Sequence, residues 1–270
     1  MSDVAVITGG AGGMGLATAH ILGRDHHILL ADLGEDKLAN AAASLRESGI
    51  SCETQVCDVT RRQSVRDLLA QAQAAGALRA VVHTAGVSPQ MAGPEVILRV
   101  NALGTVHVTE ACLDVATEDF ALVNVASMAA HLLPSIMVPT RSFPLAASAP
   151  DKFVSKISKR CRLMPKELYR NGMAYSISKQ FVIWYSQHCA AQFGQKNARI
   201  LSVSPGTFDT EMGRLEEKSG SMEMLRDAAL KRPGKPEEIA AVLAFCASDQ
   251  AGYLTGTDIL VDGGMVSGRR

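Results

Sequence analysis

Hydrophobic and polar positions follow two different periods along the chain. Short, almost continuously apolar runs alternate with longer segments, such as residues 35–48 and 64–75, in which apolar residues recur every three or four positions. A short apolar run is typical of a strand covered by helices on both faces, and the longer pattern is typical of an amphipathic helix. Seven strands are predicted, over residues 3–8, 27–31, 52–57, 80–84, 120–126, 198–204 and 258–263.

Strands that alternate with helices from end to end predict the fold class. Helical crossovers join parallel strands, so we expect an α/β fold of the Rossmann type, with a doubly wound, parallel, seven-stranded sheet. The 270 residues are 47% apolar, which is enough to bury one full core. We therefore expect residues 1–270 to form a single domain.

The alternation is interrupted at about residues 129–170, where five prolines break the pattern. Apolar residues still recur there at helical spacing, and Ser148 and Asp151 are placed as a capping box. We therefore expect a helical insert, with a helix whose apolar residues are Phe153, Ile157, Cys161 and Met164. Residues 210–225 are expected to face this insert as an opposing lid.

Charge excludes some classes of partner. Lys+Arg and Asp+Glu balance at 27 each, so no global field favours nucleic acid or an anionic membrane. Residues 141–170 hold eight Lys or Arg and two acidic residues, an excess that a solvated helix face explains most simply.

Cysteine spacing and the N-terminal pattern bear on the cellular compartment. The six cysteines show no C-x-x-C pair and no metal-ligand spacing with a histidine, so we expect reduced core thiols and no metal site. The first residues enter a strand directly and no long uncharged apolar run is present, so neither a secretory signal nor a membrane span is expected. Together these features predict a cytoplasmic protein.

Residues 8–15, TGGAGGMG, follow the first strand and open a helix. In that position Gly9, Gly13 and Gly15 allow a tight turn, a close approach of backbone to a pyrophosphate, and contact between helix and sheet. The helix N-terminus also attracts phosphate charge. The pattern predicts dinucleotide binding, and the alternative is a glycine-rich turn that binds no ligand.

Two aspartates end the next two strands. Asp32 stands 17 residues after Gly15, where a carboxylate accepts hydrogen bonds from both hydroxyls of an adenosine ribose and repels a 2′-phosphate. No basic residue stands beside it in ADLGED, and Gly12 occupies a position where an arginine would meet that phosphate, so NAD is favoured over NADP. The alternative for Asp32 is a turn aspartate. Asp58 either meets the adenine amino group or caps a helix.

The segment GMAYSISKQF places Tyr175 and Lys179 four residues apart, on one face of a predicted helix. The ammonium group can therefore favour the phenolate, and the positive ring of an oxidised nicotinamide would lower the phenol pKa further. Tyr175 is then a general base for alcohol oxidation and a general acid for ketone reduction. Ser127 ends the fifth strand, where its hydroxyl either orients the reacting oxygen or caps a helix.

These motifs stand in an order that resembles the classical type of the short-chain dehydrogenase/reductase family. The matching elements are the glycine-rich turn, HTAG at 83–86, Asn101, Ser127, Tyr175 with Lys179, and SPGTFDT at 204–210. The resemblance covers nearly the whole chain apart from the insert, and it implies an oxidoreductase acting on CH–OH groups.

The resemblance also implies roles for individual residues. Asn101 would hold a water that links the lysine to solvent, Lys179 would bind the nicotinamide ribose, and Thr210 would fix the carboxamide. For Asn101 and Thr210 a structural role in a helix or a loop is the alternative. The remaining cofactor contacts that the resemblance implies are Met14, Leu33, Val59, Ala85, Gly86, Pro205, Gly206 and Thr207.

Two departures from the family pattern matter. HTAG replaces Asn-Asn-Ala-Gly, and His83 is interpreted as a hydrogen-bonded strand residue rather than a catalyst. Ser127 and Tyr175 stand 48 positions apart, where the family has little more than a dozen. This spacing resembles the bacterial 3α-hydroxysteroid dehydrogenase/carbonyl reductases, which carry a helical insertion there, and it implies a bulky apolar or steroid-like substrate and a homodimer or homotetramer.

The sequence therefore predicts an NAD-dependent enzyme that interconverts a secondary alcohol and a ketone. A ketoacyl thioester reductase is the second hypothesis, and the lack of a 2′-phosphate site argues against it. A regulatory protein that senses dinucleotides is the third. It would need the cofactor contacts but not Ser127, Tyr175 and Lys179 together.

Overall fold

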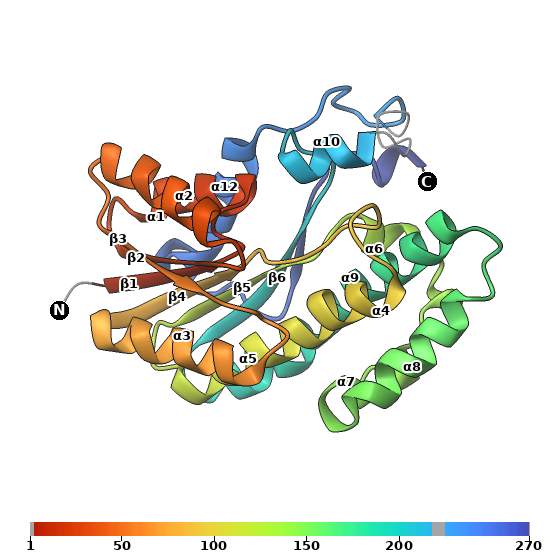
Figure 1. The fold of residues 1–270 in the computed structure, drawn as a ribbon, viewed down its shortest axis with the longest axis horizontal. Coiled ribbons are helices and arrows are strands. Elements are labelled where there is room, and N and C mark those ends of the chain that lie inside the picture. The colour runs from red at the N-terminus through yellow and green to blue at the C-terminus, as the bar shows by residue number, and fades with distance from the viewer. Residues whose placement is uncertain (1–2, 218–224, 270) are drawn as a thin grey trace.

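The computed structural model describes residues 3–217 and 225–269, so part of the predicted 210–225 lid lies outside the described residues. The predicted strands form one parallel seven-stranded sheet, in the order β3-β2-β1-β4-β5-β6-β7 (Figure 1). The strands are β1 (Asp3–Thr8), β2 (His27–Asp32), β3 (Cys52–Val56), β4 (Ala77–His83), β5 (Ala121–Val125), β6 (Arg199–Pro205) and β7 (Asp258–Val261). The Rossmann-type prediction is confirmed.

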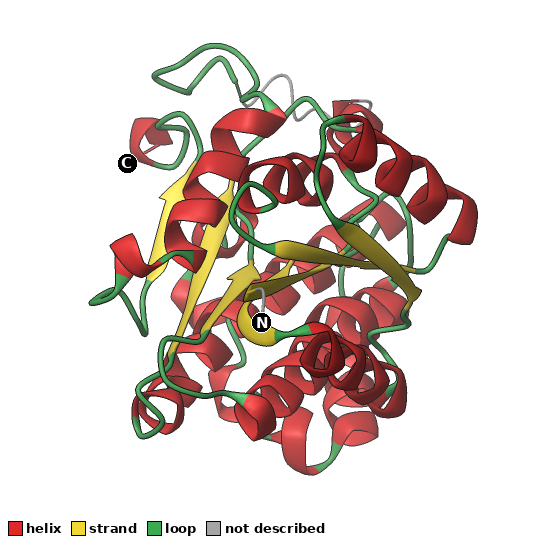
Figure 2. Ribbon diagram, turned by 90° about the vertical axis from the view of Figure 1, so that its left-hand side faces the viewer, coloured by secondary structure: helices red, strands yellow, loops and turns green. Residues whose placement is uncertain are grey.

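Helices cover both faces of the sheet (Figures 1 and 2). One face carries α1 (Gly13–Leu22), α2 (Glu35–Glu47) and α12 (Pro236–Ala247), and the other carries α3 (Arg62–Ala75), α5 (Gly104–Val115) and α9 (Glu167–Gly194). This double cover explains why the strands are almost continuously apolar. Short helical turns complete the ordered elements, with η4 at Asp249–Ala251 and η5 at Ser267–Arg269.

The order of the strands locates the ligand-binding edge. The chain starts at β1, builds outward to β3, and then crosses over to β4 on the other side of β1. Neighbouring loops at the carboxyl ends of β1 and β4 therefore diverge to opposite faces. In open α/β sheets the crevice at such a switch point is where ligands bind.

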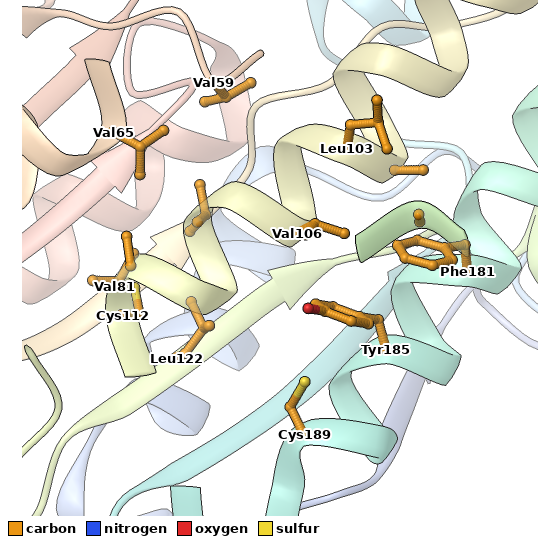
Figure 3. Close-up of a cluster of buried hydrophobic side chains, with 14 of the residues drawn as sticks. Val59, Val65, Val81, Leu103, Val106, Cys112, Leu122, Phe181, Tyr185 and Cys189 are labelled. Atoms are coloured by element: carbon orange, nitrogen blue, oxygen red, sulfur yellow. The ribbon is translucent and has the colours of Figure 1, made fainter. Parts of the chain in front are cut away.

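Helix α9 is held firmly in the core on its face of the sheet. Its aromatic rings Phe181 and Tyr185 stack at a centroid distance of 5.2 Å and lie among Leu122 of β5 and Val106 and Cys112 of α5 (Figure 3). Rings of this size bury large apolar areas and tolerate little displacement. The helix thus offers a rigid support for any side chain that it carries toward the sheet edge.

The insert leaves the sheet after β5 and packs on the helix that carries Tyr175. Phe143 lies edge-on to Phe181 at 5.4 Å and also contacts Trp184, and Phe153 lies 5.5 Å from Phe181. The predicted helical insertion is confirmed, although α9 already begins at Glu167, inside the predicted boundary at residue 170. The elements of the insert are α6 (Ala129–Leu132), η2 (Ser135–Met137), η3 (Thr140–Ser142), α7 (Leu145–Ser148) and α8 (Pro150–Cys161).

The predicted capping box of the insert is wrong. The Ser148 hydroxyl donates to the carbonyl oxygen of Pro144 at 3.0 Å, and Asp151 pairs with Arg99 at 2.9 Å. Helix α8 instead begins with Pro150, whose ring fixes a helical φ and whose missing N–H needs no cap. The spacing of Ser148 and Asp151 suggested a capping box, but α8 starts at a proline and has no side-chain cap.

One helical stretch in the described part of the chain, Pro94–Val115, is long and apolar enough to cross a membrane by length and composition alone. It comprises α4 (Pro94–Ile97), η1 (Leu98–Leu103) and α5, and 72% of its apolar window is buried inside the protein. Burial of that extent is what a core helix of a sheet protein shows. All six cysteines are free and buried, as predicted.

Candidate active site

A cleft of about 630 Å³ opens at the carboxyl edge of the sheet. The structure brings to it every residue that the sequence assigned to the cofactor, and Ser127 as well. Asn101 is the exception among the predicted site residues: it is buried behind the cleft wall.

The glycine-rich turn is shaped by close backbone contacts. Gly9 has a φ of 68°, and a Cβ there would lie 2.7 Å from the Ala85 amide nitrogen. A Cβ on Gly15 would lie 2.4 Å from the Gly9 carbonyl oxygen. No side chain caps the start of α1, and the first residues of this helix, Gly13 and Met14, line the cleft. This is the arrangement that binds a pyrophosphate.

Asp32 lies at the end of β2, beside the glycine-rich turn. Its Oδ2 accepts a hydrogen bond from the Ala11 amide at 3.3 Å, and its Oδ1 accepts one from the Leu33 amide at 2.8 Å. Sequence reasoning missed Lys37, which lines the same end of the cleft and pairs with Glu211 at 3.1 Å. Its position in the first turn of α2, five residues after Asp32, was the only signal of its approach.

The Asp58 side chain forms a local turn. Its Oδ1 accepts hydrogen bonds from the Thr60 amide at 2.9 Å and from the Thr60 hydroxyl at 2.7 Å. Both Asp58 and Val59 line the cleft, and the Val59 carbonyl accepts a hydrogen bond from His107. Helix α3 begins after Arg61 without a side-chain cap, so the helix-cap interpretation of Asp58 is wrong, and contact with adenine stays a prediction.

Asn101 braces the loop that follows β4. Its side chain forms two hydrogen bonds with the backbone of Val87, at 2.9 and 3.0 Å, and it donates to the Ser178 hydroxyl on α9. It lies in a short π-helical segment, η1, a distortion often found at functional sites. A Cβ on Gly86 would lie 3.2 Å from Asn101 Oδ1 and 3.5 Å from Lys179 Nζ, so the glycine leaves open the space between these two groups.

Ser127, Tyr175 and Lys179 meet at the wall of the cleft. Lys179 Nζ donates to the Val125 carbonyl at 2.9 Å and lies 5.8 Å from the centre of the Tyr175 ring. The Ser127 hydroxyl faces Tyr175, whose pKa it lowers, and it accepts a hydrogen bond from the Ala129 amide at 3.2 Å. Helix α6 follows Met128 without a side-chain cap, so Ser127 bonds to the first helical amide but is not its N-cap residue. Its orientation of the reacting oxygen stays a prediction.

Burial controls the proton affinities in this group. It raises the pKa of Tyr175, and the negative charge of Glu216 raises it further, against the Ser127 hydrogen bond. Burial lowers the pKa of Lys179 to about 8, against the same carboxylate. Lys179 was expected to favour the phenolate, but in the protein itself the net direction is the opposite. The cost of ionising a buried phenol is the largest cause of this upward shift.

His83 is a buried strand residue, as interpreted from the sequence. Its Nδ1 bonds with the Thr8 hydroxyl at 2.7 Å, and burial lowers its pKa to about 3. The histidine is therefore neutral at physiological pH. It lies behind the site and does not line the cleft.

The loop after β6 forms part of the cleft wall. A Cβ on Gly206 would lie 2.7 Å from the Asp262 Cα, so only glycine fits there. The Thr210 hydroxyl accepts a hydrogen bond from the Gly213 amide at 3.0 Å and caps α10 (Glu211–Glu217). A Cβ on Gly13 would lie 3.0 Å from Thr210 Cγ2, so this loop reaches the glycine-rich turn.

The remaining part of the cleft is lined mainly by apolar side chains. They come from the loop after β4, from the two ends of the insert and from α10, namely Val87, Met91, Leu132, Leu168, Tyr169, Met212 and Leu215. Residues 133–166, the middle of the insert, do not line it. The insert therefore contributes to the pocket only where it leaves Ser127 and where it joins α9.

This fold and cleft define a dinucleotide-binding oxidoreductase. The model of the family described as short chain dehydrogenase matches residues 3–140, and one described as enoyl-(acyl carrier protein) reductase matches residues 164–266. The chain belongs to the short-chain dehydrogenase/reductase family, whose members bind a nicotinamide dinucleotide and act on small molecules.

Two curated relatives align with this chain over almost their full length. The short-chain dehydrogenase/reductase bsc3 of Alternaria brassicicola is 30% identical over 99% of this chain and 97% of its own. The 3β-hydroxysteroid dehydrogenase 2 of Eggerthella lenta is 29% identical over 97% of this chain and 94% of its own.

Solved structures share the fold. Levodione reductase superposes with a TM-score of 0.78 at 22% identity, with 98% of each chain covered. A variant of actinorhodin polyketide ketoreductase with NADPH superposes with a TM-score of 0.77 at 20% identity, covering 98% of this chain and 97% of its own.

Proposed function

We propose that the protein is an NAD-dependent oxidoreductase that interconverts a secondary alcohol and a ketone on a bulky, apolar substrate. The observation that carries this proposal is the meeting of Ser127, Tyr175 and Lys179 between the glycine-rich turn and the apolar part of the cleft. A regulatory protein that only senses the dinucleotide would have no use for a phenol and a hydroxyl facing each other there.

Each residue of the group has a distinct task in this reaction. A bound nicotinamide supplies or accepts the hydride. Ser127 donates a hydrogen bond to the reacting oxygen and orients it. Tyr175 takes the alcohol proton during oxidation and returns it to the ketone oxygen during reduction. The Lys179 ammonium donates one N–H group to the Val125 carbonyl, and it binds the ribose hydroxyls with its other N–H groups. Asn101 borders the gap beside Lys179 where a water would connect the ammonium with solvent.

The substrate class follows from the apolar lining and from the insert. The relative named as a 3β-hydroxysteroid dehydrogenase supports a steroid-like or cyclic substrate, and the helical insertion supports the carbonyl-reductase subgroup. The ketoacyl thioester hypothesis is supported by a neighbour named as a polyketide ketoreductase. Reduced-nicotinamide absorbance over a panel of cyclic, steroid and thioester substrates separates them, and NAD binding without turnover on any member would favour a sensor.

Asp32 is expected to set the cofactor preference. It is fixed beside the glycine-rich turn, where its charge repels a 2′-phosphate, and the nearby Lys37 is already paired with Glu211. The native protein should bind NAD more tightly than NADP, and Asp32→Ala should reduce the preference by about tenfold or more. Calorimetric titration of both dinucleotides measures this. Equal or tighter binding of NADP by the native protein would contradict the assignment.

The chain is expected to be at least a dimer. The insert covers part of α9 through Phe143 and Phe153, whereas Phe245 of α12 is 44% exposed and Tyr253, before β7, is fully exposed. We therefore propose that residues 1–270 form one domain that associates through α12 and β7. Sedimentation velocity at micromolar concentration should show a dimer or tetramer that Phe245→Glu weakens. A monomer in the native protein would refute this.

A further inference from the structure

Helix α10 brings a carboxylate, Glu216, to the group that handles the proton. Glu216 lines the cleft together with Tyr175 and Lys179, and its charge acts on both. Its sequence context, TEMGRLEEKSG, is typical of a solvated helix face, so sequence reasoning gave it no role. A partly buried carboxylate in a largely apolar pocket is costly, which makes a specific task for it worth seeking.

The surroundings of Glu216 act on its pKa in opposite directions. Burial raises its pKa, while Ser88 and the Lys179 ammonium lower it. The Ser88 hydroxyl is fully buried and has no partner at ordinary hydrogen-bond length among the described residues, so its contact with Glu216 is a long one.

The other charged groups that the structure describes near the site are neutral, paired or farther along the cleft. His83 on β4 faces Lys179 but is neutral above about pH 3. On α10 itself, Glu211 pairs with Lys37 and Arg214 pairs with Asp209 at 2.8 Å. Asp32 and Asp58 lie at the adenosine end of the cleft. Within the described residues, Glu216 is thus the carboxylate whose charge reaches both Tyr175 and Lys179.

We propose that Glu216 is a positioning residue that keeps the proton on Tyr175 and the charge on Lys179, so that at neutral pH the site is ready to protonate a ketone. Alcohol oxidation, which needs the phenolate, then becomes fast only at higher pH. The inference rests on the proposed function of Tyr175. The inference concerns the pH range over which each direction of the reaction is fast. It does not concern the overall equilibrium, which an enzyme leaves unchanged.

The physical basis is the sign of the charge. A carboxylate beside a phenol disfavours the phenolate, and beside an amine it favours the ammonium. The positive ring of oxidised nicotinamide does the reverse for the phenol, so NAD binding should release the Tyr175 proton over a range of pH. The carboxylate of Glu216 determines where that range lies.

Proton release on NAD binding tests the proposal without any substrate. Calorimetry in two buffers of different ionisation enthalpy, from about pH 6 to about pH 10, gives the number of protons released at each pH. Glu216→Gln should move the release curve to lower pH by about half a unit or more. Glu211→Gln, a carboxylate change on the same helix, should leave the curve in place. Ser88→Ala should move it slightly in the direction of Glu216→Gln, because Glu216 then holds its own proton more tightly.

Tyr175→Phe identifies the source of the proton. It should abolish the release, and the Tyr175→Phe, Glu216→Gln double variant should likewise release no proton. If the release curve of Glu216→Gln is the same as that of the native protein, the inference is overturned and the proposed function is left intact. Release that persists in Tyr175→Phe overturns it too, and failure of NAD to bind any variant or the native protein contradicts the proposed function itself. Thermal unfolding confirms that each variant is folded.

Discussion

Replacing Tyr175 by phenylalanine is expected to lower turnover by about 10²- to 10⁴-fold, or about 3 to 5 kcal/mol of barrier, since general acid–base catalysis contributes that much. The ring of Tyr175 would still fill its place in the cleft wall, and only the hydroxyl that faces Ser127 would be lost. Affinity for NAD should therefore change by less than about threefold at pH 7, because burial already keeps the phenol protonated there.

The same helix supplies a matched control. Tyr185 is buried two to three turns further along α9, and its hydroxyl lies 3.4 Å from a Glu110 carboxylate oxygen, away from the cleft. Tyr185→Phe removes an equivalent hydroxyl and should leave steady-state turnover within about twofold. If Tyr175→Phe retains turnover within tenfold of the native protein, the phenol is not the proton donor and acceptor.

Replacing Lys179 by methionine is expected to damage both cofactor binding and turnover. The change keeps the length and apolar stem of the side chain but removes the ammonium that donates to Val125 and faces the ribose position. Hydrogen bonds from a charged donor are each worth about 1.5 to 3 kcal/mol, so NAD affinity should fall about 10- to 100-fold. Calorimetric titration measures the affinity, and steady-state kinetics measures the turnover.

Lys196 provides the comparison for this variant. It follows α9 at its far end, and its ammonium donates to backbone carbonyls of Leu113 and Asp114, as that of Lys179 does to Val125. Lys196→Met removes a similar contact on the surface and should leave NAD affinity unchanged. Native affinity in Lys179→Met would show that the lysine does not bind the cofactor.

The strands and the residues around the cofactor cleft were predictable from the sequence for one physical reason. Helices cover both faces of the sheet, so each strand is apolar throughout, and polar residues such as Asp32 and Ser127 stand out where a strand ends. Parallel strands bring such ends to one edge. The i, i+4 spacing of Tyr175 and Lys179 likewise fixes their relative positions within one helix.

Contacts between distant segments were beyond the reach of sequence reasoning. Glu216 and Lys37 lie in charged surface helices, and only the folded chain shows that they reach the cleft. The upward shift that burial gives the Tyr175 pKa could not be predicted, because the spacing identifies Lys179 but gives no measure of burial. The same holds for Ser148, whose spacing suggested a cap while Pro150 already started the helix.

The central claim is that this site transfers a hydride between a secondary alcohol and a nicotinamide with proton transfer through Tyr175. The most direct measurement is isotopic: the native protein is incubated with NAD and a cyclic secondary alcohol deuterated at its carbinol carbon, and the dinucleotide is analysed by mass spectrometry. The account predicts reduced nicotinamide that carries the deuterium, formed by the native protein and lost in Tyr175→Phe. Deuterium transfer that continues undiminished in Tyr175→Phe, or tight binding of NAD without transfer from any alcohol of the panel, would contradict it.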